Sequence, residues 1–244
     1  MTPSRLRTPR HALAAAAVLA LSTLPVQRSQ AAACTFTPLS GNWSLSTNWS
    51  CGVVPSAPPA DSAAIAAGRT VVVDSTQSIR QLANAGTINI NAFLLDLQAG
   101  PGTTNSGVIN VCSATSAALQ IGAGHNIDNT GGLINIANGS VANQFGSTIT
   151  GGTITTTGSG KVAVFNNSNN VLRGVTLNGT LDMASALAFE RVQSGLVLNG
   201  TINVNADSVL SFEGSNTLSG NGSIVFGSSG NNRLGVDNNG VLTI

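Results

Sequence analysis

Carboxylates and histidine are the residues of this chain that could most readily do chemistry, and they are few. After residue 33 the 244-residue sequence holds seven aspartates, two glutamates and one histidine. Glycoside hydrolysis needs two carboxylates that face each other across the scissile bond. The aspartates form no Asp-Asp or Asp-x-Asp cluster, so the best pair is Glu190 and Glu213, each closing a similar Leu-x-Phe-Glu segment. Two stacked acids could share a proton or bind a cation. Because acids at strand ends are usually exposed, we predict a solvated pair.

Other catalytic arrangements are missing from the sequence. His125 and Asp128 lie close together but without a nucleophile in a recognisable context. A polysaccharide lyase would need a basic residue beside an acidic calcium site, yet the basic residues are scattered and only Arg191 adjoins an acid. No phosphate loop, zinc-ligand spacing or Gly-Gly-x-Gly-x-Asp calcium repeat occurs. We therefore predict no catalytic, cofactor-binding or metal-binding residue, with a polysaccharide lyase or glycoside hydrolase as the alternative.

The composition excludes several classes of partner. Only 8% of the residues are charged, the net charge is +1, and Lys161 is the sole lysine. Nucleic-acid binding needs a clustered basic face, so we expect no nucleic-acid partner. Apolar residues nevertheless make up 42% of the chain, and their regular pattern indicates a folded protein.

A short motif recurs along the chain and predicts its fold. Eight glycines open it, and the seven intervals between Gly86 and Gly240 average 22 residues. Two residues after each glycine stands Ile or Leu, four residues after it an apolar residue in nearly every copy, and between them mostly Asn, Asp or Thr. Such alternation predicts a strand with one buried face, and a period near 22 predicts a solenoid. The eight glycines are Gly86, Gly107, Gly132, Gly152, Gly179, Gly200, Gly222 and Gly240.

These strands are too short to bury a core singly, so each must stack on its copies in neighbouring coils. We therefore predict an all-β, single-stranded, right-handed parallel β-helix with about 22 residues per coil. The hand follows from the rule for parallel crossovers. A β-sandwich would also string short strands together, but it has no reason to place Ile or Leu at one offset eight times.

The N-terminus predicts export. Residues 1–33 have a basic start, a short apolar segment and small residues before Cys34, which are the parts of a signal peptide. We expect a Cys34–Cys51 disulfide in an oxidising compartment. The alternative for Cys34 is the acylated first residue of a lipoprotein, although its flanking residues fit that motif poorly. Cys112 is left over, and we expect a small buried apolar residue.

The segment that precedes the coils resembles the start of bacterial β-helix proteins of the autotransporter-passenger and surface-adhesin type. The similarity rests on two Asn-Trp-Ser tripeptides, Pro55 and an Asp-x-Ala-x-Ile stretch that begins at Asp61. It implies a cap over residues 34–60 and coils over 61–244. Trp43 and Trp49 would cover the open first coil or form sugar-stacking platforms. Such proteins continue into an anchor, so we also expect a C-terminal continuation or a capping partner.

We expect a non-enzymatic, exported, adhesin-like stalk or ligand-binding passenger at the cell surface, outside the cell or in the periplasm, without a membrane span once the signal is removed. Its partner would be a polysaccharide or a cell-surface ligand, and a glycan- or ice-binding solenoid is a further alternative. The candidate face is an outward ladder of hydroxyl and amide side chains, which could otherwise only stabilise the stack. The ladder consists of Thr87, Asn89, Thr153, Thr155, Thr180, Thr201 and Asn203.

Overall fold

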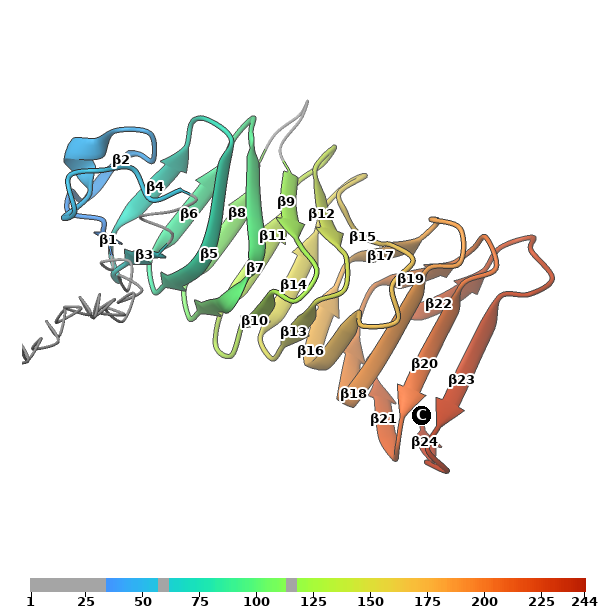
Figure 1. The fold of residues 1–244 in the computed structure, drawn as a ribbon. Coiled ribbons are helices and arrows are strands. Elements are labelled where there is room, and N and C mark those ends of the chain that lie inside the picture. The colour runs from blue at the N-terminus through green and yellow to red at the C-terminus, as the bar shows by residue number, and fades with distance from the viewer. Residues whose placement is uncertain (1–33, 57–61, 113–117) are drawn as a thin grey trace, which may run out of the picture.

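The computed structural model describes residues 34–56, 62–112 and 118–244. Its parallel strands stack as a β-solenoid of about eight turns, with stacked residues roughly 21 apart in the sequence (Figure 1). The predicted all-β, coiled fold is therefore confirmed. Within the described ranges the only helical turn is the 3-10 segment η1 (Ser46–Asn48). The predicted signal peptide lies outside the described residues.

After the N-terminal segment, each complete turn contributes one strand segment to each of three parallel sheets. Sheet I contains β2 (Ser40–Asn42), β4 (Thr70–Val73), β6 (Thr87–Ile90), β8 (Val108–Val111), β11 (Leu133–Ile136), β14 (Thr153–Thr156), the ends of β16 (Val171–Asn178) and β18 (Phe189–Leu198), β21 (Asn216–Ser219) and β24 (Leu242–Thr243). Sheet II contains the beginnings of β5 (Gln77–Asn84) and β7 (Leu94–Asn105), then β9 (Ala118–Ile121), β12 (Val141–Gln144), β15 (Lys161–Val164), β17 (Thr180–Met183), β19 (Thr201–Val204) and β22 (Ser223–Phe226). Sheet III contains β1 (Cys34–Thr35), β3 (Ser62–Ile65), the ends of β5 and β7, β10 (Asn126–Asp128), β13 (Thr148–Thr150), the beginnings of β16 and β18, β20 (Val209–Glu213) and β23 (Arg233–Asp237).

The core lies between the three sheets and consists of stacked apolar columns. In sheet I, Ile88 is opposite Ile109, which in turn is opposite Ile134, and each is at most 1% exposed. Strands such as β6, β8 and β11 alternate buried and half-buried residues, as the motif predicts. Burying one such side chain stabilises the fold by about 1.5–3 kcal/mol, and every coil repeats the gain.

The eight glycine motifs do not form one column, so that part of the prediction is wrong. The first four lead into strands of sheet I, whereas those opened by Gly179, Gly200 and Gly222 lead into sheet II, and Gly240 returns to sheet I. The motif changes from sheet I to sheet II in the 27-residue interval that follows Gly152. There the sheet I segment 175–178 forms without the motif.

The corner before sheet I and the corner before sheet II both need glycine for the same physical reason, which explains why one motif occurs before strands of both sheets. A Cβ at Gly107 would overlap the main-chain oxygen of Gly86, and a Cβ at Gly200 would overlap that of Gly179. The motif therefore reports a tight corner followed by a half-buried strand, and it does not specify which corner of the coil.

The N-terminal segment packs on the first coil, at the blue end of Figure 1. Trp43 is fully buried and Trp49 is 3% exposed, which agrees with capping and leaves neither ring free to stack on a sugar. The indole of Trp43 donates to the carbonyl of Pro55 at 2.9 Å, and that of Trp49 donates to the carbonyl of Trp43 at 2.8 Å. The predicted Cys34–Cys51 disulfide is present. Because Cys34 is disulfide-bonded, it has no free thiol to be acylated, and the lipoprotein alternative is wrong.

Candidate functional site

The register separates Glu190 from Glu213, so the predicted solvated pair does not form. Both lie on sheet III, but Glu190 is opposite Leu210, while Glu213 is opposite Asp237 in the next coil. Glu190 points into the core and is 0% exposed. Glu213 points outward, and its side chain is 16% exposed because Arg191 covers it.

Glu213 belongs instead to a row of polar side chains on the outer face of sheet III. Arg173 donates from Nε and Nη2 to Oε1 of Gln193, at 3.0 and 2.6 Å. Gln193 in turn donates a hydrogen bond from Nε2 to Oε2 of Glu213, at 2.5 Å. Arg191 forms an ion pair with the same glutamate, with Nη1 at 2.9 Å from Oε1 of Glu213.

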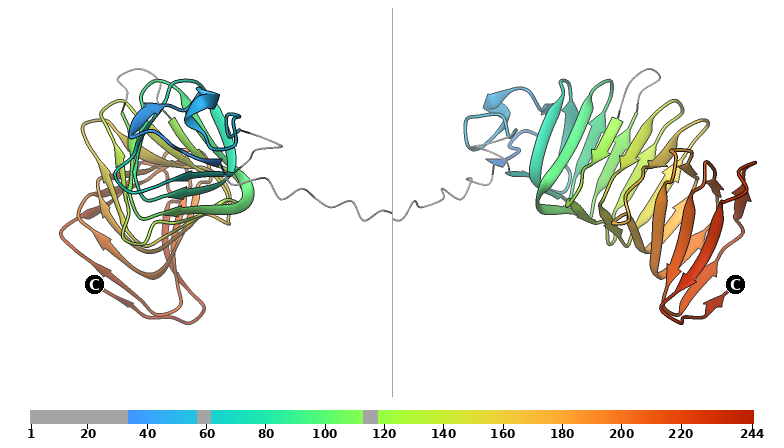
Figure 2. Two further views of the ribbon diagram at one scale, coloured as in Figure 1. Left: turned by 90° about the vertical axis from the view of Figure 1, so that its left-hand side faces the viewer. Right: turned by 45° about the vertical axis from the view of Figure 1, so that its right-hand side comes forward.

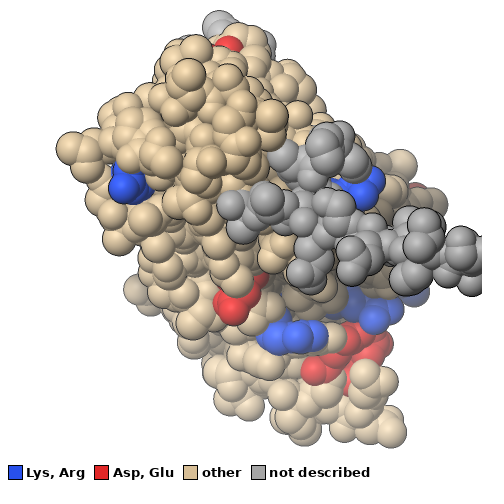
Figure 3. Space-filling model, turned by 60° about the vertical axis from the view of Figure 1, so that its left-hand side comes forward, with Lys and Arg blue, Asp and Glu red and all other residues tan. Residues whose placement is uncertain are grey.

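Two further contacts extend this row at its edges. The hydroxyl of Ser211 donates to the carboxylate of Asp237 in the following coil, and the guanidinium of Arg191 lies 5.6 Å from the ring centre of Phe189. Charged side chains gather over the C-terminal coils in Figure 3, while the rest of that face carries few. We call Arg173, Arg191, Gln193, Glu213 and Asp237 the charged row.

The predicted hydroxyl and amide ladder is divided between two sheets. Its members from 87 to 155 lie on sheet I, whereas Thr180, Thr201 and Asn203 lie on sheet II. On sheet I an amide ladder does form, because Asn110 donates to Asn89 at 2.8 Å. The predicted ladder is therefore not a single face, because its members belong to two separate stacks.

His125 is a buried structural residue and does not face Asp128. Its Nδ1 lies 2.6 Å from the carbonyl of Gln98 and its Nε2 lies 2.8 Å from Oγ1 of Thr103. A carbonyl can only accept, so Nδ1 carries the hydrogen and Nε2 accepts from Thr103. Burial lowers the pKa of His125, partly offset by the Gln98 hydrogen bond and the charge of nearby Asp96. Asp128 is exposed, and hydrogen bonds from Thr130 lower its pKa.

Cys112 contradicts the expectation of a buried filler, since it is exposed at the end of β8. Partial burial still raises the pKa of its thiol. Across the described residues no group of three or more His, Cys, Asp and Glu could hold a metal ion. In the same part of the chain no helix is long and apolar enough to cross a membrane.

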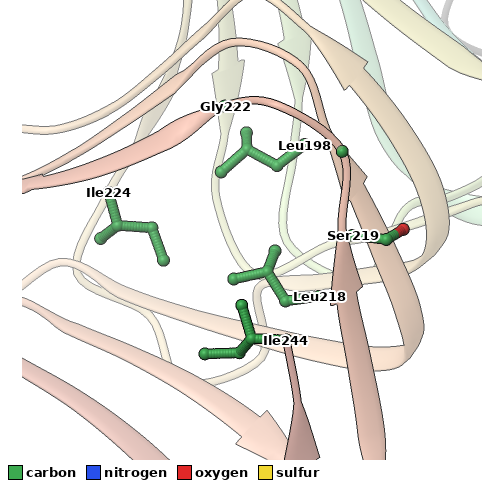
Figure 4. A pocket seen from close by; sticks show the side chains of 7 residues that line it. Leu198, Leu218, Ser219, Gly222, Ile224 and Ile244 are labelled. Carbon is green, nitrogen blue, oxygen red and sulfur yellow. The ribbon is translucent and has the colours of Figure 1, made fainter.

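An apolar hollow of about 160 Å³ lies at the C-terminal end of the core (Figure 4). The side chains of Leu198, Leu218, Ile224 and Ile244 point into it. None of these four side chains titrates, so they offer packing surface and no acid–base chemistry.

The charged row escaped prediction although the sequence holds a signal for it. Arg173, Gln193 and Glu213 are 20 residues apart, close to the coil period, and this spacing favours stacking. Alternation about Val192 likewise placed Glu190 inside and Arg191 outside. No family model, curated protein or solved structure is significantly similar to this chain.

Proposed function

We propose that this protein is a non-enzymatic, exported, adhesin-like solenoid that binds polysaccharide on the outer face of sheet III. The charged row is the observation that carries the proposal. It brings hydrogen-bonding side chains from successive coils onto one surface, where they form a line along which a linear polymer can bind. The disulfide is compatible with an exported protein.

The chemistry of the face favours acidic polysaccharides. Arg173, Arg191 and Arg233 all lie on sheet III in consecutive or nearby coils. Guanidinium groups bind carboxylates through paired hydrogen bonds. Phe189, next to Arg191, adds an apolar surface against which a sugar ring can pack.

The alternatives find less support. A glycosidase needs two facing carboxyls, but Asp182 is paired with Lys161, Glu213 with Arg191, and Asp237 accepts from Ser211. The other described aspartates likewise accept hydrogen bonds from neighbouring protein groups. Glu190 has the raised pKa of an acid catalyst, yet no solvent reaches it. An ice-binding face would need an uninterrupted lattice of threonines, and the ladder is divided between two sheets.

Affinity electrophoresis tests the proposal directly. The mature chain, residues 34–244, is run through native gels that contain polygalacturonate or neutral dextran. We expect polygalacturonate to retard it, and Arg173→Gln and Arg191→Gln to abolish most of the retardation. Arg80→Gln is the matched control, because it removes the same charge from an exposed arginine outside the row.

Two results would contradict the proposal. Unchanged retardation of both row variants would show that another surface binds. Release of reducing ends or of unsaturated uronides from the polymer by the purified chain would show that the protein is an enzyme.

A further inference from the structure

The solenoid contains a junction between its N-terminal and C-terminal coils. The coils from β16 onward are displaced from the earlier ones, as Figure 1 and both views of Figure 2 show. The register of β16 against β18 also shifts between Arg173 and Val175. Just beyond, Leu187 has a φ of 58° and is 56% exposed. A left-handed conformation at leucine is strained by roughly 1–2 kcal/mol, so this corner is held by its surroundings.

A column of buried polar residues runs along the inner corner between sheets II and III. Asn126, Thr148, Val171 and Arg191 are successive register partners. The residue that precedes each of them points inward, and each is at most 1% exposed. These inward residues are His125, Ser147, Asn170 and Glu190.

This corner is lined with main-chain carbonyls, which suit side chains that donate hydrogen bonds. The carbonyl of Gln98 accepts from His125 at 2.6 Å. Asn170 donates to the carbonyls of Phe165 and Phe189, at 2.8 and 3.0 Å. An ionised carboxylate has no hydrogen to donate, whereas a protonated carboxyl has one.

Glu190 is the member of the column that does not fit in its charged form. Neither carboxylate oxygen has a hydrogen-bond partner. The nearby main-chain amide of Leu172 favours the charged form, but the removal of water dominates and holds the pKa of Glu190 well above its usual range. The adjacent Nε of Arg191 is also buried without a partner.

No charged side chain faces Glu190 from the strands packed against it. In the preceding coil, the inward residues next to Glu190 are Asn170, just before β16, and Leu172 in β16. In the following coil, Leu210 of β20 is opposite Glu190. The charges of Arg191 and Glu213 lie on the outer face. The buried Oγ of Ser147 lacks a partner too, but two strand spacings, about 9.6 Å, separate it from Glu190.

We propose that Glu190 is a proton-operated latch on the corner between β17 and β18, closed while its carboxyl is protonated and opened when the proton passes to solvent. Opening lets the carboxylate reach water and relieves the strain at Leu187. Because the folded-state pKa is raised, the closed corner is stable at low pH and is lost as pH rises through that pKa. Arg191 follows Glu190 directly, so opening also draws it away from Glu213. This link between opening at Glu190 and the Arg191–Glu213 pair rests on the proposed function of the charged row.

Hydrogen–deuterium exchange at several pH values tests the latch without any ligand. Exchange of amides 187–192 in the mature chain is measured from pH 5 to 9 and corrected for the intrinsic rate with unstructured peptides. We expect the opening constant of the wild type to rise by up to about tenfold per pH unit above the ordinary glutamate pKa of 4.5, and to level off above the raised pKa of the closed state. Glu190→Gln, which cannot ionise, should remove that rise. Asp128→Asn, on the exposed face of the same sheet, should keep it.

Peptides from β6 and β8 separate local opening from global unfolding, since they stay protected if only the corner opens. Glu190→Leu gives the same information should the Gln variant fold poorly, because Leu matches the opposite Leu210. The latch is wrong if wild type and variants share one pH dependence at 187–192, or if β6 and β8 lose protection in parallel with the corner.

Discussion

Reduction of the Cys34–Cys51 disulfide should loosen the N-terminal end of the solenoid and leave its C-terminal coils unchanged. The bond joins residues separated by 17 positions. Closing a loop of that length removes about 10 cal/mol/K of entropy from the unfolded segment, or about 3 kcal/mol at 25 °C. Since coils contact only their neighbours, the effect falls on the cap and the first coil. A loss of that size corresponds to a rise of roughly 150-fold in the local opening constant.

Hydrogen–deuterium exchange measures this constant coil by coil. Peptides that cover 34–55 and 62–73 are compared, with and without dithiothreitol, against peptides from β19 and β22. The measurement uses a Cys112→Ala background, so that the remaining exposed thiol plays no part. Equal protection of the cap in both redox states would refute the entropy argument. A uniform loss in all coils would refute the nearest-neighbour picture.

Two further changes test the corners and the buried histidine. Gly107→Ala should lower Tm by roughly 5 °C, because its Cβ would overlap the main chain of Gly86 and overpacking costs about 1–3 kcal/mol. Gly230→Ala, which meets nothing within 4 Å, should leave Tm nearly unchanged, and equal shifts would contradict the argument. The pKa of His125 is lowered on folding, so the unfolded state binds the proton first, and stability should fall as pH drops below the ordinary value of 6.5, by up to about 1.4 kcal/mol per pH unit. Urea denaturation between pH 7.5 and 5 should show a flatter dependence of the unfolding free energy on pH for His125→Gln than for the wild type. Parallel profiles would exclude His125 as the cause of the pH dependence.

The fold could be predicted from the sequence because the solenoid repeats one physical requirement in every coil. Alternation such as Thr87-Ile88-Asn89-Ile90 defines a half-buried strand, and its recurrence leaves stacking as the way to bury the apolar face. The assignment of motifs to sheets could not be predicted. A glycine followed by such a strand satisfies the corner before sheet I and the corner before sheet II equally well.

The candidate site was less accessible to sequence analysis, because it depends on register. Glu190 and Glu213 close similar segments, and that likeness suggested that they stack. The structure offsets them, since Phe212 is opposite Val192 and Glu213 therefore follows Gln193 in the outward column. Glu213 lies three residues beyond Leu210, the partner of Glu190, and an odd offset places two residues on opposite faces of a sheet. The expected pair is therefore a buried acid, Glu190, and a surface ion pair of Glu213.

Burial explains why the two titratable residues of the inner column must respond to pH in opposite directions, because it lowers the pKa of a base and raises that of an acid. Main-chain carbonyls at the corner accept hydrogen bonds from His125 and Asn170, so the corner suits a side chain that is neutral and can donate a hydrogen. His125 meets both conditions when it is neutral, and acid removes that state. Glu190 meets them when it is protonated, and alkali removes that state. The N-terminal coils should therefore be the acid-sensitive part of the solenoid and the junction its alkali-sensitive part.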